Sequence, residues 1–354
     1  MIRQTVHTAR KYDIFIGEGL LEQAGALARE ANDGARALVV TDSNVGPLYA
    51  AKTAASLDAA GYRTGVFTFP AGEASKRLDT VAAIYARLAA AGFTRSDLVV
   101  ALGGGVAGDM AGFAAATWLR GIDFVQLPTS LLAQVDSSVG GKTGVDIPEG
   151  KNLVGAFWQP VRVIADTAAL DTLPPEYLVD GLGEVVKTAA IRDAALFAAL
   201  ERGDALSREH REDTVAACVA IKRGVVERDE REAGERKLLN FGHTLGHALE
   251  TYYRYKGPSH GRAVAVGMAL LTDASERRGM TAPGAAARLR ALLRDLGLPC
   301  DDPVPPREFL PAAALDKKRA GRDIDLVLLR AIGDAYVHRI PMDSLAAFVC
   351  GEKA

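Results

Sequence analysis

Residues 98–119 have the sequence LVVALGGGVAGDMAGFAAATWL, in which an apolar run passes through three glycines into an alanine-rich segment. Residues 98–102 have the composition of a buried strand, and the segment after Gly105 that of a helix. The glycines and Asp109 exclude a membrane helix. Backbone N–H groups at such a strand-to-helix turn can bind the pyrophosphate of a nucleotide. A tight turn that needs positive φ explains the glycines equally well, because the motif is neither GxGxxG nor a P-loop.

The same alternation of strand and helix extends outward from this turn. Strand-like runs at 37–41 and 64–69 precede alanine-rich helical segments at 50–60 and 78–91. This order predicts an α/β nucleotide-binding domain with a mostly parallel, doubly wound sheet. Polar side chains follow the first two strands in the segments TDSN (41–44) and GEASK (72–76), and parallel strands place such loops at one edge of the sheet, the usual place for a nucleotide.

The second half of the chain has helical rather than strand periodicity. Helices are expected at 178–191, 194–201, 214–228, 244–253, 263–278 and 285–296. The breaker Leu173–Pro174–Pro175 marks the boundary. The sequence therefore predicts two domains, an α/β domain over 1–173 and an α-helical domain over 174–354, in which the residues considered below would bind a metal and a substrate.

Composition excludes several classes of protein. The 354 residues are 49% hydrophobic and 24% charged, as in globular proteins. The formal net charge of -2 gives no general attraction for nucleic acid or an anionic membrane. Three cysteines without a CxxC pair argue against a disulfide framework, and residues 1–17 lack the apolar core of a secretory signal. We expect a cytoplasmic protein.

Polar side chains concentrate in residues 127–152, LPTSLLAQVDSSVGGKTGVDIPEGKN. Its hydroxyl, carboxylate, amide and ammonium groups suit a phosphorylated ligand, although a solvated loop would have a similar composition. The charged run KRGVVERDEREAGERK over 222–237 is expected to be solvated, with Lys222 and Arg236 at its ends as its best functional candidates.

Candidate metal ligands lie in the helical half. His243 and His247 are four residues apart and share one helix face, and His260 and Glu184 could complete a zinc site with a position open to substrate. A hydrogen-bonded helix face explains the histidine pair equally well.

Six motifs together resemble the 3-dehydroquinate synthase family of sugar phosphate cyclases. In chain order they are GGGVAGDMAGFAA, LPTSLLAQVDSSVGGKTGVD, GKNLVGAF, GLGEVVK, LNFGHTLGHALE and SHGRAVAVGM, and the resemblance covers about residues 42–329. It implies a nucleotide-binding α/β domain followed by an α-helical metal-binding domain.

The resemblance also implies cofactors and their residues. NAD is expected to contact Asp42, Asn44, Glu73, Lys76, Gly105, Val106, Asp109, Thr129, Ser130, Asp136, Lys142, Lys151, Thr172 and Leu173. A divalent metal, zinc or alternatively cobalt, is expected on Glu184, His243 and His260. In this ligand set His247 is not a metal ligand, and it is expected to contact the substrate instead.

The implied substrate is 3-deoxy-D-arabino-heptulosonate 7-phosphate, which is converted to 3-dehydroquinate and phosphate in the shikimate pathway. The steps are transient oxidation by NAD, phosphate elimination, re-reduction, ring opening and aldol closure. The residues implied for the substrate phosphate, carboxylate and hydroxyls are Lys142, Asn152, Lys317, Lys222, Arg236, Lys187, Asn240 and His247. Arg120 is implied to reach the neighbouring subunit's site in a homodimer.

The sequence differs from the family pattern at one place, and two other functions remain as alternatives to the implied one. Ala168–Ala169–Leu170 stands where the family often has a bulkier residue, which predicts a lost packing contact near NAD. Iron-dependent alcohol and glycerol dehydrogenases share the general plan, but a small alcohol would not require the basic residues. Other cyclases act on sedoheptulose 7-phosphate or glucose 6-phosphate, which have no carboxylate. Lys222 and Arg236, the residues implied to bind a carboxylate, therefore distinguish these functions from the implied one.

Overall fold

The computed structural model describes residues 1–317 and 323–351, and the side chains of residues 314–317 lie outside this description. The chain forms two compact units. Unit 1 contains Met1–Pro174 and Arg211–Glu230, and unit 2 contains Pro175–His210 and Arg231–Ala354. The first break in the chain lies at the Pro174–Pro175 pair, next to the expected boundary.

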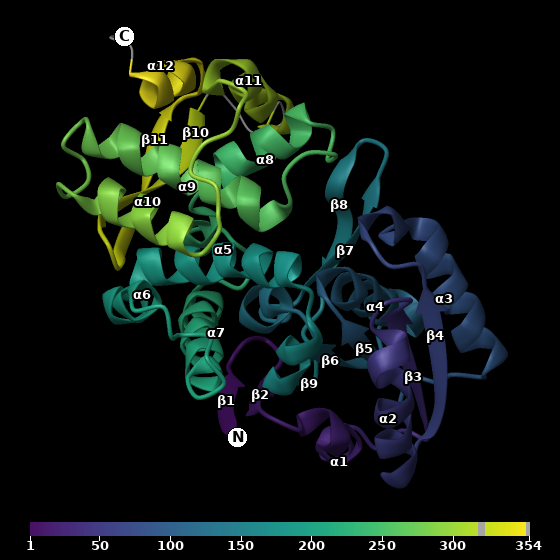
Figure 1. The fold of residues 1–354 in the computed structure, drawn as a ribbon. Coiled ribbons are helices and arrows are strands. Elements are labelled where there is room, and N and C mark those ends of the chain that lie inside the picture. Colours follow the sequence, from purple (N-terminus) through teal and green to yellow (C-terminus); the bar gives the residue numbers. More distant parts are fainter. Residues whose placement is uncertain (318–322, 352–354) are drawn as a thin grey trace. The chain divides into compact units, whose positions relative to one another are not determined.

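Unit 1 is built on a seven-stranded sheet with the order β1-β2-β9-β6-β5-β3-β4 (Figure 1). Its strands are β1 (Ile2–Val6), β2 (Tyr12–Gly17), β3 (Arg36–Asp42), β4 (Arg63–Phe69), β5 (Leu98–Gly103), β6 (Asp123–Pro128) and β9 (Arg162–Asp166). All neighbouring pairs are parallel except β1 and β2. The mostly parallel sheet predicted from the sequence is confirmed.

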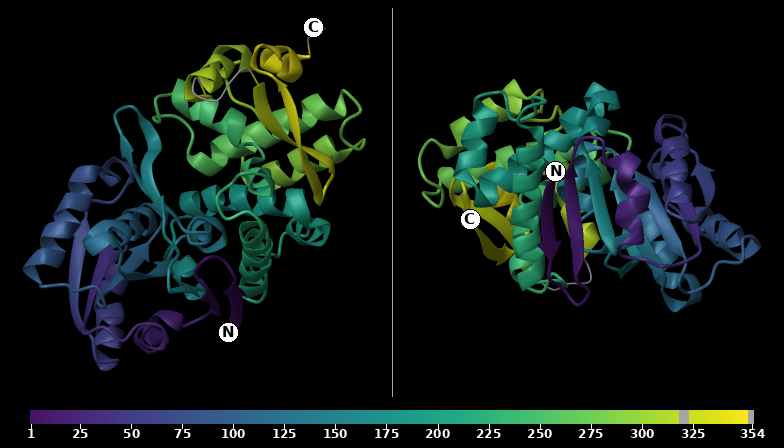
Figure 2. Two further views of the ribbon diagram at one scale, coloured as in Figure 1. Left: turned by 180° about the vertical axis from the view of Figure 1, so that it is seen from behind. Right: turned by 90° about the horizontal axis from the view of Figure 1, so that it is seen from below.

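Helices cover both faces of this sheet, because its strands are apolar on both sides. Along β5, Leu98, Val100 and Leu102 pack into the core shared with α1 (Ala24–Arg29) and α2 (Gly46–Ala59). The alternate residues Val99 and Ala101 pack into the core shared with α3 (Leu78–Ala90) and α4 (Gly105–Thr117). Successive side chains of a strand point to opposite faces of the sheet, so β5 contributes to the cores on both sides of it. Figure 2 shows the sheet and its helices from two further sides.

Two further parts of unit 1 differ from the expectation. Residues 142–157, for which no strand was predicted, form the antiparallel hairpin of β7 (Lys142–Ile147) and β8 (Gly150–Phe157). Helix α7 (Arg211–Arg228), expected in the helical domain, packs against β1, β2 and the π-helical turn η4 (Ala133–Ser137). The other short turns are η1 (Leu20–Gln23), η2 (Glu73–Ser75), η3 (Trp118–Arg120) and η5 (Thr167–Thr172).

Unit 2 is mainly helical, as expected. Its elements are α5 (Pro175–Arg192), α6 (Ala194–Glu201), η6 (Glu235–Asn240), α8 (His243–Tyr252), α9 (His260–Glu276), α10 (Ala285–Asp295), α11 (Pro306–Lys317), β10 (Asp323–Ala331), β11 (Asp334–Pro341), η7 (Met342–Ser344) and α12 (Leu345–Cys350). Helix α9 packs against α5, α8 and α10, and its alanine and valine side chains are buried. The antiparallel hairpin of β10 and β11 adds Ile324, Leu326 and Leu328 to the core.

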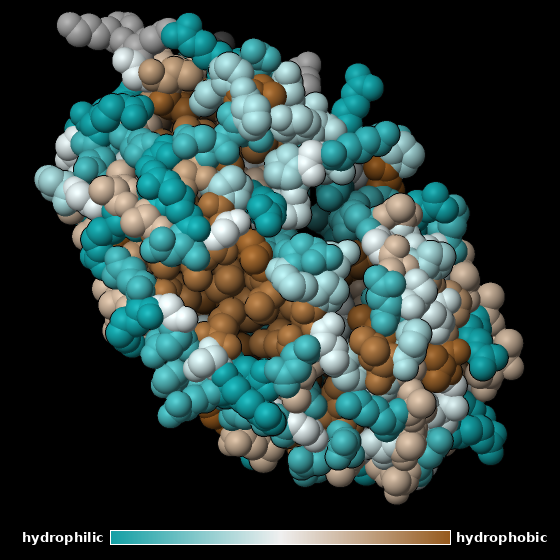
Figure 3. All heavy atoms as spheres, in the orientation of Figure 1, coloured by the Kyte–Doolittle hydropathy of each residue, from teal (hydrophilic) through white to brown (hydrophobic). Residues whose placement is uncertain are grey.

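The surface of the described residues mixes hydrophilic and apolar side chains. Figure 3 shows apolar spheres beside β4 and on the β7–β8 hairpin, and the exposed apolar residues of these strands are Val66, Leu153 and Phe157. Within the described part of the chain, no helix has both the length and the apolar character needed to cross a bilayer.

Candidate active site

Three side chains of unit 2 converge from three helices. Glu184 lies within α5, whereas His243 and His260 are the first residues of α8 and α9. The Oε1 atom of Glu184 is 3.6 Å from Nε2 of His243 and 3.4 Å from Nε2 of His260. One ligand atom from each residue lies within 4.8 Å of the other two. The three residues implied as metal ligands are therefore adjacent in the fold.

Glycines allow these helices to approach closely enough. A Cβ on Gly261 would stand 1.9 Å from the backbone oxygen of Asp180, and one on Gly183 would stand 2.6 Å from the backbone oxygen of Gly261. The N–H of Gly261 donates to Oδ1 of Asp180 at 2.7 Å. Only hydrogen atoms fit at these contacts between α5 and the start of α9. The glycines of GLGEVVK and SHGRAVAVGM thus bring Glu184 and His260 together.

A hydrogen bond at Nδ1, the ring nitrogen that faces away from Glu184, orients the ring of His243. Its Nδ1 lies 3.2 Å from the backbone oxygen of Phe241, so an Nδ1–H donates there and leaves the Nε2 lone pair toward Glu184. Burial, together with the nearby ammonium of Lys187, lowers the pKa of His243 well below its usual value. The ring is therefore neutral at pH 7, which is the form that binds metals.

His260 lies between two carboxylates. Nε2 faces Glu184, and Nδ1 is 3.5 Å from Oε1 of Glu250. Burial disfavours the charged ring, but the interactions with Glu184 and Glu250 outweigh burial and raise the pKa of His260 to about 10. The ring of His260 thus faces a carboxylate at each of its two nitrogens.

The residues of this cluster fit a divalent metal. A tetrahedral zinc ion with ligands at about 2.0–2.1 Å separates its ligand atoms by roughly 3.3 Å, close to the 3.4 and 3.6 Å found here. Glu184 is 1% exposed at its side chain, and its Oε1 faces the Nε2 atoms of both histidines. The ammonium of Lys187 forms an ion pair with it one helical turn away. The His260 side chain is 34% exposed, which leaves one side open for a ligand.

Other predicted substrate residues lie on the same unit. The exposed His247 ring is centred 5.4 Å from that of His243 and 5.8 Å from that of His260. On η6, Arg236 is 2% exposed, and Nδ2 of Asn240 donates to Oε1 of Glu232 at 2.8 Å. The charged run that ends at Lys237 is thus not uniformly solvated.

In unit 1 the chain reverses direction across the sheet between β3 and β5, since β4 lies outside β3 and β5 lies inside it. Asp42 ends β3 and Gly103 ends β5, at the carboxyl edge where parallel sheets bind nucleotides. Oδ1 of Asp42 accepts from the N–H groups of Asn44 and Val45 at 2.8 and 2.9 Å. A Cβ on Gly103 would lie 3.5 Å from Oδ2 of Asp42.

The start of α4 borders the segment after β6. A Cβ on Gly104 would lie 3.3 Å from Oγ of Ser130, and one on Gly105 would lie 3.2 Å from Oγ of Ser137. The N–H of Thr129 donates to the oxygen of Gly103 at 3.0 Å. The predicted cofactor residues Gly105, Val106, Thr129 and Ser130 therefore surround one helix N-terminus, a favourable position for a pyrophosphate.

Lys76 connects this region to the β7–β8 hairpin. Its ammonium, on a residue that is 5% exposed, lies 2.7 Å from Oδ2 of Asp109 and 2.6 Å from Oδ1 of Asn152. Burial would lower the pKa of Lys76, but Asp109 and Glu73 outweigh it and raise the pKa. Lys151 forms an ion pair with Glu73 at 3.3 Å. Lys76 is therefore buried between two other predicted site residues.

The remaining predicted residues of unit 1 lie on several different elements. The ammonium of Lys222 bonds to the carboxylate and the backbone oxygen of Asp136, which joins α7 to η4. Thr172 bonds to the hydroxyl of Tyr49 and is followed by Leu173, while Ala169 packs into the sheet core. Arg120 and Lys142 are exposed on η3 and β7. Lys317 ends α11, and its side chain, like Lys318, lies outside the described residues.

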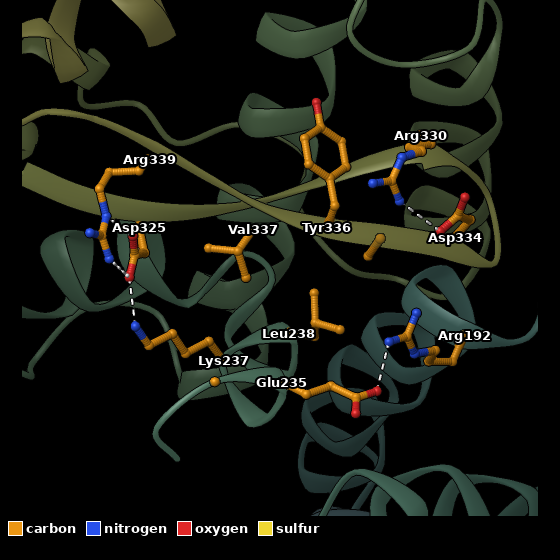
Figure 4. Close-up of a pocket in the computed structure, with 12 residues that line it drawn as sticks. Arg192, Glu235, Lys237, Leu238, Asp325, Arg330, Asp334, Tyr336, Val337 and Arg339 are labelled. Atoms are coloured by element: carbon orange, nitrogen blue, oxygen red, sulfur yellow. Dashed lines mark hydrogen bonds and ion pairs between the residues drawn. The ribbon is translucent and has the colours of Figure 1, made fainter. Parts of the chain in front are cut away.

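A separate cavity of about 610 Å³ lies between η6, the end of α5 and the β10–β11 hairpin. Figure 4 shows that its charged side chains form ion pairs: Arg192 with Glu235, Lys237 and Arg339 with Asp325, and Arg330 with Asp334. None of the residues that line it is a candidate metal ligand. Two of these ion pairs involve Glu235 and Lys237, the residues on either side of Arg236 in η6.

Two carboxylates beside predicted residues were missed from the sequence, Glu232 and Glu250. Glu250 follows His243 by seven residues and His247 by three on the same helix face, so the pattern i, i+4, i+7 could have revealed it. Glu232 lies in the charged run, where no periodicity distinguishes it from its neighbours.

Comparison with known proteins identifies the family of the chain. The family models for the N-terminal and C-terminal parts of 3-dehydroquinate synthase match residues 66–180 and 181–319. The 3-dehydroquinate synthase of Clostridium acetobutylicum is 46% identical over 332 residues, which are 93% of each chain. That of Geobacter metallireducens is 48% identical over 347 residues, 97% of this chain and 96% of the relative.

Solved structures of two related synthases match the fold over nearly the whole chain. A 2-deoxy-scyllo-inosose synthase complexed with carbaglucose-6-phosphate, NAD+ and Co2+ is 26% identical with a TM-score of 0.87, over 98% of this chain and 99% of that one. A 2-epi-5-epi-valiolone synthase from Streptomyces hygroscopicus with NAD+ and Zn2+ is 29% identical with a TM-score of 0.86, over 99% of each chain. An iron-containing alcohol dehydrogenase, 19% identical with a TM-score of 0.63 over 87% of this chain and 91% of that one, shares the fold alone. With both family models matched and relatives identical at nearly half of the aligned positions, the chain belongs to the 3-dehydroquinate synthase family.

Proposed function

We propose that this chain converts 3-deoxy-D-arabino-heptulosonate 7-phosphate to 3-dehydroquinate and phosphate, as a step of the shikimate pathway toward aromatic amino acids. The observation that carries the proposal is the Glu184–His243–His260 cluster, with ligand atoms within 4.8 Å, in a chain of this family. The enzyme is a lyase that uses NAD and a divalent metal. The three cysteines are free thiols, which favours the reducing cytoplasm.

NAD is assigned to the carboxyl edge of the sheet in unit 1. The support is the reversal of strand order between β3 and β5 and the glycine turn that opens α4. Asp42 and Asn44 follow β3, and Gly105 and Val106 begin α4. When bound, NAD supplies a reversible oxidation of the substrate, and it is regenerated within each turnover.

Zinc is our choice for the metal, held by Glu184, His243 and His260. Two imidazoles and one carboxylate form a donor set typical of catalytic zinc, and cobalt accepts the same ligands. When bound, the metal polarises a substrate hydroxyl as a Lewis acid. Lys187 and the exposed His247 are assigned to substrate hydroxyls, because both lie within one helical turn of a metal ligand.

The substrate carboxylate is assigned to Arg236 and Lys222, and its phosphate to Lys142, Asn152 and Lys317. An Arg guanidinium offers paired donors that match a carboxylate, and ammonium and amide groups suit a phosphate. Asn152 accepts from Lys76 through Oδ1, so its amide NH₂ remains oriented to donate.

We further propose a homodimer in which Arg120 completes the neighbouring site. Leu119 and Arg120 both have positive φ, 49° and 69°, a conformation that costs energy in residues other than glycine. Exposed apolar side chains, Leu119 at 40% and Phe157 at 48%, belong to the same unit, and burial against a second copy would stabilise them.

Substrate comparison tests the proposed reaction. Purified protein with Zn2+ and NAD would be offered 3-deoxy-D-arabino-heptulosonate 7-phosphate, sedoheptulose 7-phosphate, glucose 6-phosphate and glycerol in turn, with carbocyclic products identified by mass spectrometry. We expect 3-dehydroquinate from the first and no product from the others. A carbocycle from a sugar phosphate without a carboxylate would reassign the substrate, and oxidation of glycerol would reassign the reaction class.

A further inference from the structure

Glu250 is a buried carboxylate that the proposed mechanism does not use. It lies on α8 and is 6% exposed, and its Oε1 is 3.5 Å from Nδ1 of His260 on α9. The opposite nitrogen of the same ring, Nε2, is 3.4 Å from Glu184. One imidazole is thus held between two carboxylates, of which Glu184 is the proposed metal ligand.

We propose that Glu250 is a positioning residue that fixes the tautomer and orientation of His260 for metal binding. By accepting from Nδ1–H, its carboxylate leaves the Nε2 lone pair directed at the position shared with Glu184. A charged acceptor also makes the imidazole a stronger donor to a metal. This role rests on the proposed metal centre and extends it beyond its three ligands.

The second histidine provides an internal comparison. Nδ1 of His243 lies 3.2 Å from the backbone oxygen of Phe241, so each proposed histidine ligand has an acceptor behind its ring. The acceptor of His243 is a neutral carbonyl that no side-chain substitution removes. The acceptor of His260 is a carboxylate, and substitution of Glu250 therefore isolates the effect of this second shell on one ligand.

The placement of Glu250 also connects two helices. His243 and Glu250 lie seven residues apart on α8 and so share one face, whereas His260 begins α9. Gly246 on α8 allows the close approach, since a Cβ there would stand 3.1 Å from the backbone oxygen of Ala263. The carboxylate thereby holds the first residue of α9 against the helix that carries the other histidine ligand.

Metal affinity, measured without substrate or NAD, tests the proposal on the full chain. Glu250→Gln keeps an acceptor without the charge, and Glu250→Ala removes it. Zn2+ dissociation constants would be measured by competition with a chromophoric chelator, and Co2+ absorption would report the ligand geometry. We expect Glu250→Ala to weaken Zn2+ binding about 10- to 100-fold and Glu250→Gln to weaken it less, with the tetrahedral Co2+ bands retained.

Glu276→Gln is the matched control, since this carboxylate ends α9 and accepts from the N–H groups of Gly284 and Ala286, remote from His260 in sequence. Its Zn2+ affinity should equal that of the wild type. Far-UV circular dichroism would establish that each variant is folded, and the conservative Glu250→Gln decides the question if Glu250→Ala does not fold.

Three outcomes would overturn the role. A folded Glu250→Ala protein with Zn2+ affinity within twofold of the wild type would show that Glu250 does not position the ligand. A second Zn2+ ion, lost on substitution, would make Glu250 a ligand together with His247 and His260, whose ligand atoms also lie within 4.8 Å. A wild-type protein that binds no Zn2+ would contradict the metal centre itself, and Glu250's role with it.

Discussion

Arg236 is the residue on which the choice of substrate depends. It is 2% exposed, and a buried guanidinium requires an anionic or polar partner. Replacement by alanine should leave the substrate carboxylate unpaired and cost about 3 kcal/mol, on the order of a 100-fold loss in kcat/KM. Steady-state kinetics with the heptulosonate substrate would measure this loss.

Lys237→Ala is the control for Arg236, because its ammonium pairs with Asp325 at 2.8 Å on the side of η6 that faces the cavity. Its kcat/KM should change by less than about threefold, the effect of a partly exposed ion pair. An Arg236→Ala enzyme as efficient as Lys237→Ala would remove Arg236 from the carboxylate site.

Asp97 illustrates how a single buried carboxylate makes stability depend on pH. It is 0% exposed and accepts from the N–H groups of Ala35, Arg36 and Thr94. Burial would raise its pKa, but these hydrogen bonds, the Thr94 hydroxyl and the charge of Arg36 outweigh burial and hold the pKa below its usual value. The stabilisation is therefore present above pH 4 and is lost as the pH falls through the lowered folded-state pKa.

Asp97→Asn should consequently lower the free energy of unfolding by about 1–3 kcal/mol at pH 7. The difference from the wild type should shrink below pH 4, where the wild-type carboxyl becomes protonated as well. Urea unfolding from pH 7 to pH 3, with a chelator present so that metal release does not contribute, measures both curves. Curves that remain parallel over this range would contradict the assignment.

The approach of α5 to α9 determines whether Glu184 can meet His260. Gly261→Ala should force the helices apart, because the new methyl group would stand 1.9 Å from the backbone oxygen of Asp180. We expect a loss of about 1–3 kcal/mol in unfolding free energy together with weaker Zn2+ binding. Chemical denaturation and chelator competition would measure the two effects.

Gly224→Ala is the control for this substitution, since the glycine lies inside α7 and its added Cβ would meet only the flexible end of Arg228, at 3.4 Å. It should stabilise the protein by about 0.5–1 kcal/mol, as alanine does inside a helix. A Gly261→Ala protein with equal or greater stability and unchanged metal affinity would show that the close contact is not needed.

The elements also show what sequence patterns can and cannot predict. Strands β3, β4 and β5 were predicted from their β-branched and apolar runs, and α5 to α10 from their helical periodicity, whereas no strand was predicted at β1, β2, β6 or β9. The β7–β8 hairpin was missed because residues 142–157 are polar and glycine-rich, without strand alternation. Periodicity shows that α7 is a helix but not that it packs on unit 1. Likewise, the spacing of His243 and His247 cannot reveal that His260 reaches Glu184 from another helix.

The proposed homodimer can be tested by mixing two kinds of variant subunit. Arg120→Ala and Lys222→Ala homodimers should each be nearly inactive. In a mixed dimer, the Arg120→Ala subunit keeps its own Lys222 and receives Arg120 from the other subunit, so one complete site returns. Subunit exchange followed by a phosphate-release assay should therefore restore part of the activity. No recovery in a sample that mass spectrometry shows to contain mixed dimers would place Arg120 outside the partner's site.

In the proposed reaction, one NAD molecule serves many turnovers of a phosphate-eliminating cyclase. The most direct measurement is phosphate release from 3-deoxy-D-arabino-heptulosonate 7-phosphate with Zn2+ and substoichiometric NAD, with NADH absorbance followed in the same cuvette. We predict many phosphates per NAD and no accumulation of NADH, because oxidation and re-reduction occur within one turnover. Absence of phosphate release, with NADH instead formed steadily from simple polyols, would contradict the account and indicate a dehydrogenase.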